Sequence, residues 1–404
     1  MNKNTDSEIL QDIINDFNNQ KLDIALKKLE KLKIKFSDTY IVNKLFASIY
    51  FKKMNWKKSI IFYKKNLFNE KEKFINYLNI GIAFFKLGEI HNSIDSYKRS
   101  IENNPKFETA YGNLAISLIE IGEYEEAIKN FLIMIKLNKN NYFAKKNIIN
   151  LFNFIDTKNF KNDSLVIINN KIKNIVNNLK IKDFNKFENL KKILIESDNI
   201  LKEYKDNLSV EETQIYRKNS QNLNCKRHFN LFNKFNVISK YCFSCYKIQI
   251  ILNNVIDLIR LYFIFDNIYL ENNNIRKCVV ELRENIKGNY KGYIYCNGLE
   301  DARTILEKLN IILKNNKFKN SEITIKHGCS EYYKTFPKFK NINFKGDQEF
   351  QYDEMWKEKE ILIDSLEPTR SQMDKKVLIN TTKGLNLSDI LIIKNWINYA
   401  EYIG

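Results

Sequence analysis

The chain has 404 residues, of which 44% are hydrophobic and 13% aromatic, so a mainly disordered chain is excluded and two or three folded domains are expected. Its formal net charge is +18, but the lysines are spread through ordinary amphipathic segments, so the charge favours nucleic-acid binding only weakly. The N-terminus lacks the apolar core of a secretory signal, and charged residues interrupt the most apolar run, 255–270. We therefore expect a cytoplasmic protein without a membrane span.

A repeat with a period of 34 residues occupies the first part of the chain. Gly88 and Gly122 fall at equivalent turns of two units, and Pro105 closes one unit. Three equivalent positions recur at this period, one small or apolar (Ile13, Ala47, Gly81, Ala115), one small (Ala25, Ser59, Ser93, Ala127) and one large (Leu29, Tyr63, Tyr97, Phe131). In this period and pattern, residues 1–154 resemble the tetratricopeptide repeat family, most strongly over 74–139. The resemblance implies a right-handed α-solenoid that binds a protein or peptide partner.

An amide recurs at the same period. Asn79, Asn113 and Asn147 are 34 residues apart, and each precedes the aligned small position by two residues, which predicts one amide per repeat on the inner face. Because a carboxamide both donates and accepts, such a row can hydrogen-bond the main chain of an extended peptide. It resembles the asparagine ladder in the repeats of protein O-linked N-acetylglucosamine transferases. The predicted apolar contacts beside the row are Ile82, Phe85, Ile116 and Ile119.

Residues 155–224 keep the helical period but lose the repeat, so they are expected to form a helical connector. Helices are predicted at 166–179 and 184–208, and Ser209 with Glu212 forms a capping box that predicts the start of a third helix. Residues 225–340 predict a ferredoxin-like α+β domain with the order βαββαβ. Residues 341–404 are expected to be an arm that ends in a helix capped by Asn386 and Asp389.

The predicted α+β domain contains all six cysteines of the chain and two of its three histidines. Cys225 and His228 are separated by two residues, as are Cys242 and Cys245, and this spacing suits tetrahedral zinc. Three alternatives stay open: an iron–sulfur cluster on Cys225, Cys242, Cys245 and one further cysteine, a redox-active C-x-x-C pair, and buried free cysteines.

The βαββαβ order also brings distant residues to one edge of the sheet. Strand directions place a group of cysteine, histidine and arginine residues there as a possible active site: Arg227, Arg276, Cys278, Cys296, His327 and Cys329. Further candidates by proximity are Glu281, Arg283, Ser330 and Glu331.

Three functions follow from these patterns. The first is a protein-interaction protein that binds a peptide or protein partner through its repeats and carries a zinc-stabilised C-terminal domain. The second is an enzyme whose repeats recruit a protein or carrier substrate to the predicted edge. The third and weakest is a nucleic-acid-binding protein that uses Arg217 and Arg227.

Overall fold

The computed structural model describes residues 3–33, 39–157, 159–160, 163–204, 208–218, 223–284, 286–366 and 380–403. Parts of three predictions therefore lie outside the described residues: 34–38 of the repeats, 205–207 and 219–222 of the connector, and 367–379 of the arm. The chain forms two compact units, whose boundary falls after Lys145. The predicted connector is not a separate body, because its described residues from 155 onward belong to the second unit.

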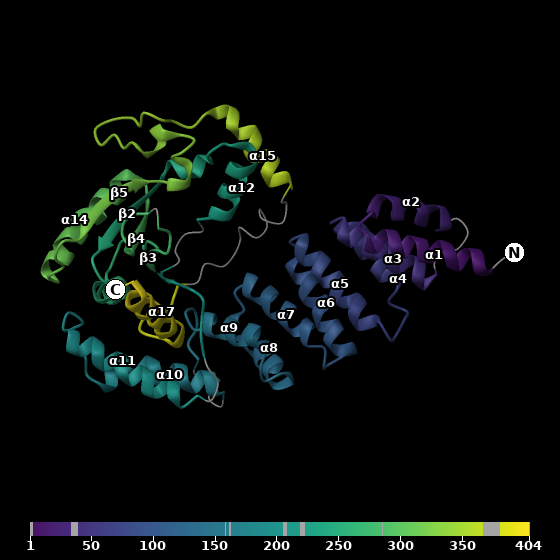
Figure 1. Cartoon of the computed structure of the whole chain (residues 1–404), viewed down its shortest axis with the longest axis horizontal. Helices are drawn as coiled ribbons and strands as arrows, with labels where there is room; N and C mark the ends of the chain where they lie inside the picture. Colours follow the sequence, from purple (N-terminus) through teal and green to yellow (C-terminus); the bar gives the residue numbers. More distant parts are fainter. Residues whose placement is uncertain are drawn as a thin grey trace. The chain divides into compact units, whose positions relative to one another are not determined.

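The first unit is a series of antiparallel helix pairs, drawn in purple to blue in Figure 1. Consecutive helices pack on one another, which confirms the helical solenoid predicted for the N-terminal part. The helices are α1 (Lys3–Asn18), α2 (Leu22–Lys33), α3 (Tyr40–Lys52), α4 (Trp56–Lys65), α5 (Lys73–Lys86), α6 (Ile90–Asn103), α7 (Glu108–Glu120) and α8 (Tyr124–Leu137), followed by α9 (Tyr142–Leu151), which contains the unit boundary.

The small residues of the repeat allow paired helices to approach closely. A Cβ atom on Gly81 would lie 2.5 Å from the ring of Tyr97, so only glycine fits there. Gly88 has a φ of +75° at the turn between α5 and α6, a conformation that favours glycine. In the first helix pair, Lys28 of α2 contacts Asp16 of α1 at 2.6 Å. An ion pair therefore joins these two helices.

The second unit contains an antiparallel five-stranded sheet with helices packed against it. Its helices are α10 (Ser164–Asn178), α11 (Phe187–Lys202), α12 (Cys225–Phe235), α13 (Val255–Asn267), α14 (Leu299–Asn315), α15 (Lys357–Leu366) and α17 (Leu387–Ile403). Its strands are β1 (Gln214–Arg217), β2 (Cys245–Leu252), β3 (Arg276–Val280), β4 (Tyr290–Asn297) and β5 (Glu322–His327). Short 3-10 helices are η1 (Lys240–Phe243), η2 (Ser330–Tyr332), η3 (Pro337–Lys340) and η4 (Glu354–Trp356).

The strand order across the sheet is β1-β3-β4-β2-β5, and every neighbouring pair is antiparallel. Successive side chains point to opposite faces of a strand. In β4, Gly292 and Ile294 are buried, and a Cβ on Gly292 would lie 2.4 Å from Leu261 of α13. These residues therefore face the helix, and Tyr293 and Tyr295, which alternate with them, face the other way.

The capping box at Ser209 and Glu212 does not start a helix, and that prediction is wrong. Residues 208–213 have no regular structure, and β1 follows them at the edge of the sheet. The reason lies in the next residues, because Ile215 and Arg217 are buried while Gln214 and Tyr216, which alternate with them, are exposed. This alternation fits an edge strand better than a helix. The terminal helix is present as α17, and the Asp389 backbone N–H donates to the Asn386 side chain at 3.0 Å.

No helix in the described part of the chain is both long enough and apolar enough to cross a membrane.

Candidate functional site

The first candidate site is a pair of amide side chains on α5 and α7. Asn79 and Asn113 occupy equivalent positions of successive repeats, on helices that contact each other. Both residues are half-buried, and neither side chain makes a hydrogen bond within the described residues. Each amide therefore keeps a donor and an acceptor for a ligand.

Of the other residues predicted for this site, the third amide lies in the second unit and the apolar residues lie on α5 and α7. Asn147 lies in the part of α9 that belongs to the second unit, and it already takes part in an interaction. The apolar residues predicted to flank the row are all half-buried on α5 and α7, and they are Ile82, Phe85, Ile116 and Ile119. The first unit thus combines two free amides with four partly accessible apolar side chains.

The second candidate site is a cavity of about 480 Å³ on the sheet face opposite α13. This volume lies in the range typical of small-molecule sites, roughly 300–1,000 Å³. Strands β1 to β4 supply its floor, α12 supplies Cys225 and Phe229, and the residues after β5 supply Cys329 and Ser330. The floor carries two lysines and three tyrosines, namely Lys247, Lys277, Tyr216, Tyr293 and Tyr295.

Strand register places these floor residues side by side. Tyr216 of β1 is opposite Lys277 of β3, and Lys277 is opposite Tyr293 of β4. One row further along, Tyr295 of β4 is opposite Lys247 of β2. Residues directly opposite each other in adjacent strands share a face, so lysines and tyrosines alternate across the floor.

The two floor lysines have no acidic partner. Within the described residues neither Lys247 nor Lys277 forms an ion pair, and both ammonium groups approach the same ring. Lys277 Nζ lies 5.0 Å from the centroid of Tyr293, and Lys247 Nζ lies 5.8 Å from it. Burial, together with the like charge of Lys247, lowers the pKa of Lys277 to about 8.

The acidic residues at the rim are already neutralised. Arg283 contacts both carboxylate oxygens of Glu281 at 2.8 Å, and this hydrogen bonding lowers the pKa of Glu281 to about 2. Glu281 is also 3.8 Å from the ammonium group of Lys291, which is fully buried. Arg283 approaches Glu331 at 3.6 Å. The rim charges therefore compensate one another, whereas the floor charges do not.

Three cysteines lie around the same end of the sheet. Burial raises the pKa of Cys225, Cys245 and Cys329, and the charge of Cys329 raises the pKa of Cys225 and Cys245 further. Lys247 acts in the opposite direction on each of them. The thiols are therefore neutral at neutral pH and do not offset the lysine charges.

The four predicted zinc ligands do not form a coordination site. Cys242 is buried, and its Sγ is 3.7 Å from the hydroxyl oxygen of Tyr332. His228 stacks on Tyr241 with ring centroids 5.3 Å apart, and burial lowers its pKa to about 4. Across the residues that the structure describes, no three His, Cys, Asp or Glu side chains are placed to hold a metal ion. Zinc and the iron–sulfur alternative thus stay predictions from spacing.

The residues of the predicted edge have mostly structural positions. Arg276 is buried and donates to the carbonyl oxygens of Phe265 and Ile268 at 2.7 and 2.8 Å. Both ring nitrogens of His327 lie about 3 Å from backbone carbonyl oxygens, those of Phe339 and Phe243. These contacts use both ring nitrogens of His327 and one terminal nitrogen of Arg276.

The predicted meeting of the three edge cysteines also needs correction. Cys296 of β4 and His327 of β5 are both opposite Tyr246, at the start of β2, and Cys329 follows β5. Cys278, however, is opposite Gly292 in the middle of β4. It is buried there on the helix-facing side. In the pairing of β3 with β4, Arg276 is opposite Ile294 and Cys278 is two residues further along β3, so Cys278 does not reach the edge.

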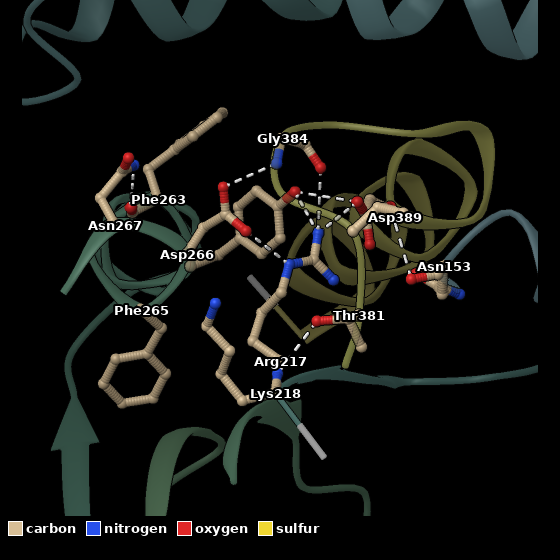
Figure 2. Close-up of polar contacts among 12 residues, drawn as sticks. Asn153, Arg217, Lys218, Phe263, Phe265, Asp266, Asn267, Thr381, Gly384 and Asp389 are labelled. Carbon is tan, nitrogen blue, oxygen red and sulfur yellow. Dashed lines mark hydrogen bonds and ion pairs between the residues drawn. The ribbon is translucent and has the colours of Figure 1, made fainter. Parts of the chain in front are cut away.

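The two arginines predicted to contact nucleic acid are both engaged inside the second unit. Arg227 binds Glu360 and Asp364 and so joins α12 to α15. Arg217 is only 2% exposed and lies between Asp266 and Asp389, which it contacts at 2.9 and 2.5 Å (Figure 2). Neither guanidinium is free to bind a phosphate backbone. The prediction that Arg217 and Arg227 contact nucleic acid is therefore corrected: both arginines bind carboxylates within the second unit.

Sequence reasoning missed the cavity floor, although a signal was present. In β4 the tyrosines Tyr293 and Tyr295 alternate with Gly292 and Ile294. A strand with aromatic residues on one face and small or aliphatic residues on the other suggests two different environments. Of the residues proposed earlier, the cavity includes Cys225 and Cys329 and four named by proximity, which are Glu281, Arg283, Ser330 and Glu331.

Comparisons with known proteins identify the repeats alone. Family models described as tetratricopeptide repeat match residues 76–107 and 96–129, and none matches the C-terminal half. No curated protein matches the chain. Similar solved structures include MamA, at 17% identity over 51% of this chain and 98% of that chain, with a TM-score of 0.35. The Arabidopsis OM64 repeat domain is 22% identical over 28% of this chain and 93% of that chain, with a TM-score of 0.26. The first repeat domain of Spaghetti (RPAP3) bound to an HSP90 peptide is 21% identical over 28% of this chain and 91% of that chain, with a TM-score of 0.27. Residues 76–129 are therefore tetratricopeptide repeats.

Proposed function

We propose that the first unit binds an extended segment of a protein partner, chiefly through the partner's main chain. The observation that supports this proposal is the pair Asn79 and Asn113, which are half-buried, equivalent in successive repeats and without a hydrogen bond. Both side chains are partly accessible and keep a donor and an acceptor. A ligand that supplies N–H and C=O groups could therefore hydrogen-bond both amides.

The spacing of these amides suits an extended peptide. Repeats stack so that equivalent positions form a regular row along the concave face of the solenoid. A carboxamide that donates to one carbonyl and accepts from one N–H holds the peptide backbone without reading its side chains. Ile82 and Ile116, three residues after each amide and half-buried, would add apolar contact with little sequence preference.

The first prediction concerns the double substitution Asn79→Ala with Asn113→Ala. Peptides are selected from a random display library against the full chain, and their affinities are measured by calorimetry. Loss of two amides, each making hydrogen bonds worth about 1 kcal/mol net, should weaken the selected peptides roughly 10- to 30-fold. Circular dichroism should show unchanged helicity, because neither side chain bonds to the protein.

The matched control is Asn92→Ala with Asn103→Ala, which removes two asparagine side chains from the exposed surface of α6. This control should retain the affinity of the parent chain. Selected peptides that bind the Asn79 and Asn113 variant as tightly as the parent would refute the proposal.

We also infer that β2 to β5 with α13 and α14 form a ferredoxin-like unit to which β1 adds an edge strand. The support is the chain order β2-α13-β3-β4-α14-β5 together with the sheet order β3-β4-β2-β5. This arrangement is the split βαβ pattern, and it implies no particular activity.

Zinc binding by Cys225, His228, Cys242 and Cys245 is a further proposal, and it rests on spacing alone. We place the protein in a reducing compartment, the cytoplasm, where the six free thiols would persist. Protein purified without oxygen should contain one zinc ion per chain by elemental analysis, and Cys242→Ser should lower the melting temperature of the second unit. Protein that contains no metal, and whose melting temperature is unchanged by a chelator, would contradict this proposal. An iron–sulfur absorption band would favour the iron–sulfur alternative over zinc.

A further inference from the structure

The floor of the sheet-face cavity concentrates positive charge on lysines that form no ion pair within the described residues. Lys247 and Lys277 both line the cavity and approach the ring of Tyr293. Lys326 of β5 is opposite Lys247, and its pKa is lowered by burial and then by the charge of Lys247. Like charges directly opposite each other in a sheet are destabilising, so this arrangement costs stability unless a ligand offsets it.

The groups around Lys277 define what the cavity accepts. Tyr216 and Tyr293 flank it from β1 and β4, Lys247 faces it from β2, and Cys225 and Cys329 face it from α12 and from the residues after β5. Glu281 and Glu331 are the acidic groups that line the cavity, and Arg283 contacts both of them. Two ammonium groups without carboxylate partners, enclosed by aromatic rings and neutral thiols, favour a dianion.

We propose that this cavity binds a small phosphate-bearing ligand, with its phosphate between Lys247 and Lys277 and the rest of the molecule against Tyr293 and Tyr295. Lysine is a common phosphate ligand because its ammonium group is a compact point charge. A phosphate monoester carries nearly two negative charges at neutral pH, which matches the two uncompensated lysines. The cavity of about 480 Å³ has the size of a small-molecule site, and α12 and the residues after β5 line it together with the sheet.

The test is site-resolved acylation of lysines in the full chain, with inorganic phosphate as the probe. A lysine reacts only when neutral, so its labelling rate over a pH series, read by mass spectrometry, gives its own titration. In chloride Lys277 should titrate near pH 8. In phosphate at equal ionic strength its titration should move to higher pH, and its labelling near pH 8 should fall several-fold, because a bound anion stabilises the charged form.

Internal controls come from the same spectra. Lys240 and Lys287 are exposed and paired with Glu354 and Glu322, and their labelling should be the same in phosphate and chloride. In Lys247→Gln, Lys277 should titrate at higher pH without phosphate, because a like charge is gone, and the effect of phosphate should shrink. Labelling of Lys277 that is equal in phosphate and chloride overturns the proposal. Protection by a single-stranded oligonucleotide but not by phosphate also overturns it and assigns the face to nucleic acid instead.

Discussion

Replacing Arg217 by methionine should destabilise the second unit by about 3 to 5 kcal/mol, which is the usual cost of leaving a buried charge unpaired. Arg217 bonds Asp266, Asp389 and the hydroxyl of Tyr262, and all four side chains are buried (Figure 2). Removal of the guanidinium would leave two carboxylates without their counter-charge. Because these residues come from β1, α13 and α17, the loss should loosen three elements that are distant in sequence.

The measurement is urea unfolding of the full chain with Trp56 and Trp356 changed to phenylalanine, so that fluorescence reports Trp396, which is fully buried in α17. Arg283→Met is the matched control, since Arg283 is 61% exposed and paired with Glu281. A pair of this kind contributes at most about 1 kcal/mol. Adding Asp266→Asn and Asp389→Asn to Arg217→Met should recover part of the lost stability. A midpoint for Arg217→Met equal to that of the control would show that the network adds no stability.

Acid should destabilise the second unit by about 3 kcal/mol through His228 alone. Burial and then Arg227 lower the pKa of His228 from 6.5 to about 4. In unfolded protein the histidine gains a proton near pH 6.5, whereas in folded protein it gains one only near pH 4. The unfolded state therefore binds more protons in this interval. The stability that neutral His228 contributes is fully present above pH 6.5 and is lost as the pH falls toward 4.

The surroundings of His228 explain why the neutral form is held. The ring stacks on Tyr241, and its Nδ1 lies 3.5 Å from the guanidinium of Arg227. Glu360 and Asp364 favour the charged form but are engaged by Arg227. Urea midpoints measured between pH 7 and pH 4 should fall less steeply for His228→Gln than for the parent chain. His91→Gln, which removes an exposed histidine of α6, should keep the parent slope for the second unit; equal slopes in all three proteins would contradict the account.

The helical repeats could be predicted from the sequence because their pattern is local and strict. A 34-residue period fixes which residues must be small, and Gly81 against Tyr97 shows the contact that requires it. Strands β2 and β5 were also predictable, since Ile248 and Ile250, like Ile323 and Ile325, alternate with polar residues. In each case neighbouring residues carry the information.

The sheet-face cavity depends on register, and register is not a local property. Lys277 and Tyr293 are adjacent only because β3 pairs with β4 in this register. For the same reason Cys278 misses the edge at which its position along the chain would place it. Strand β1 was missed because four residues that follow a capping-box pattern give too little alternation to outweigh it.

The most direct test of the proposed main-chain recognition compares two scans of one selected peptide against the full chain by calorimetry. In the first scan each residue is changed to alanine, and in the second each backbone N–H is methylated in turn. Recognition through Asn79 and Asn113 predicts that methylation at positions matching the repeat spacing weakens binding about 10-fold, whereas most alanine changes cost little. The Asn79→Ala, Asn113→Ala variant should lose this sensitivity to methylation. A peptide whose affinity falls with its side chains and is indifferent to backbone methylation would contradict the account.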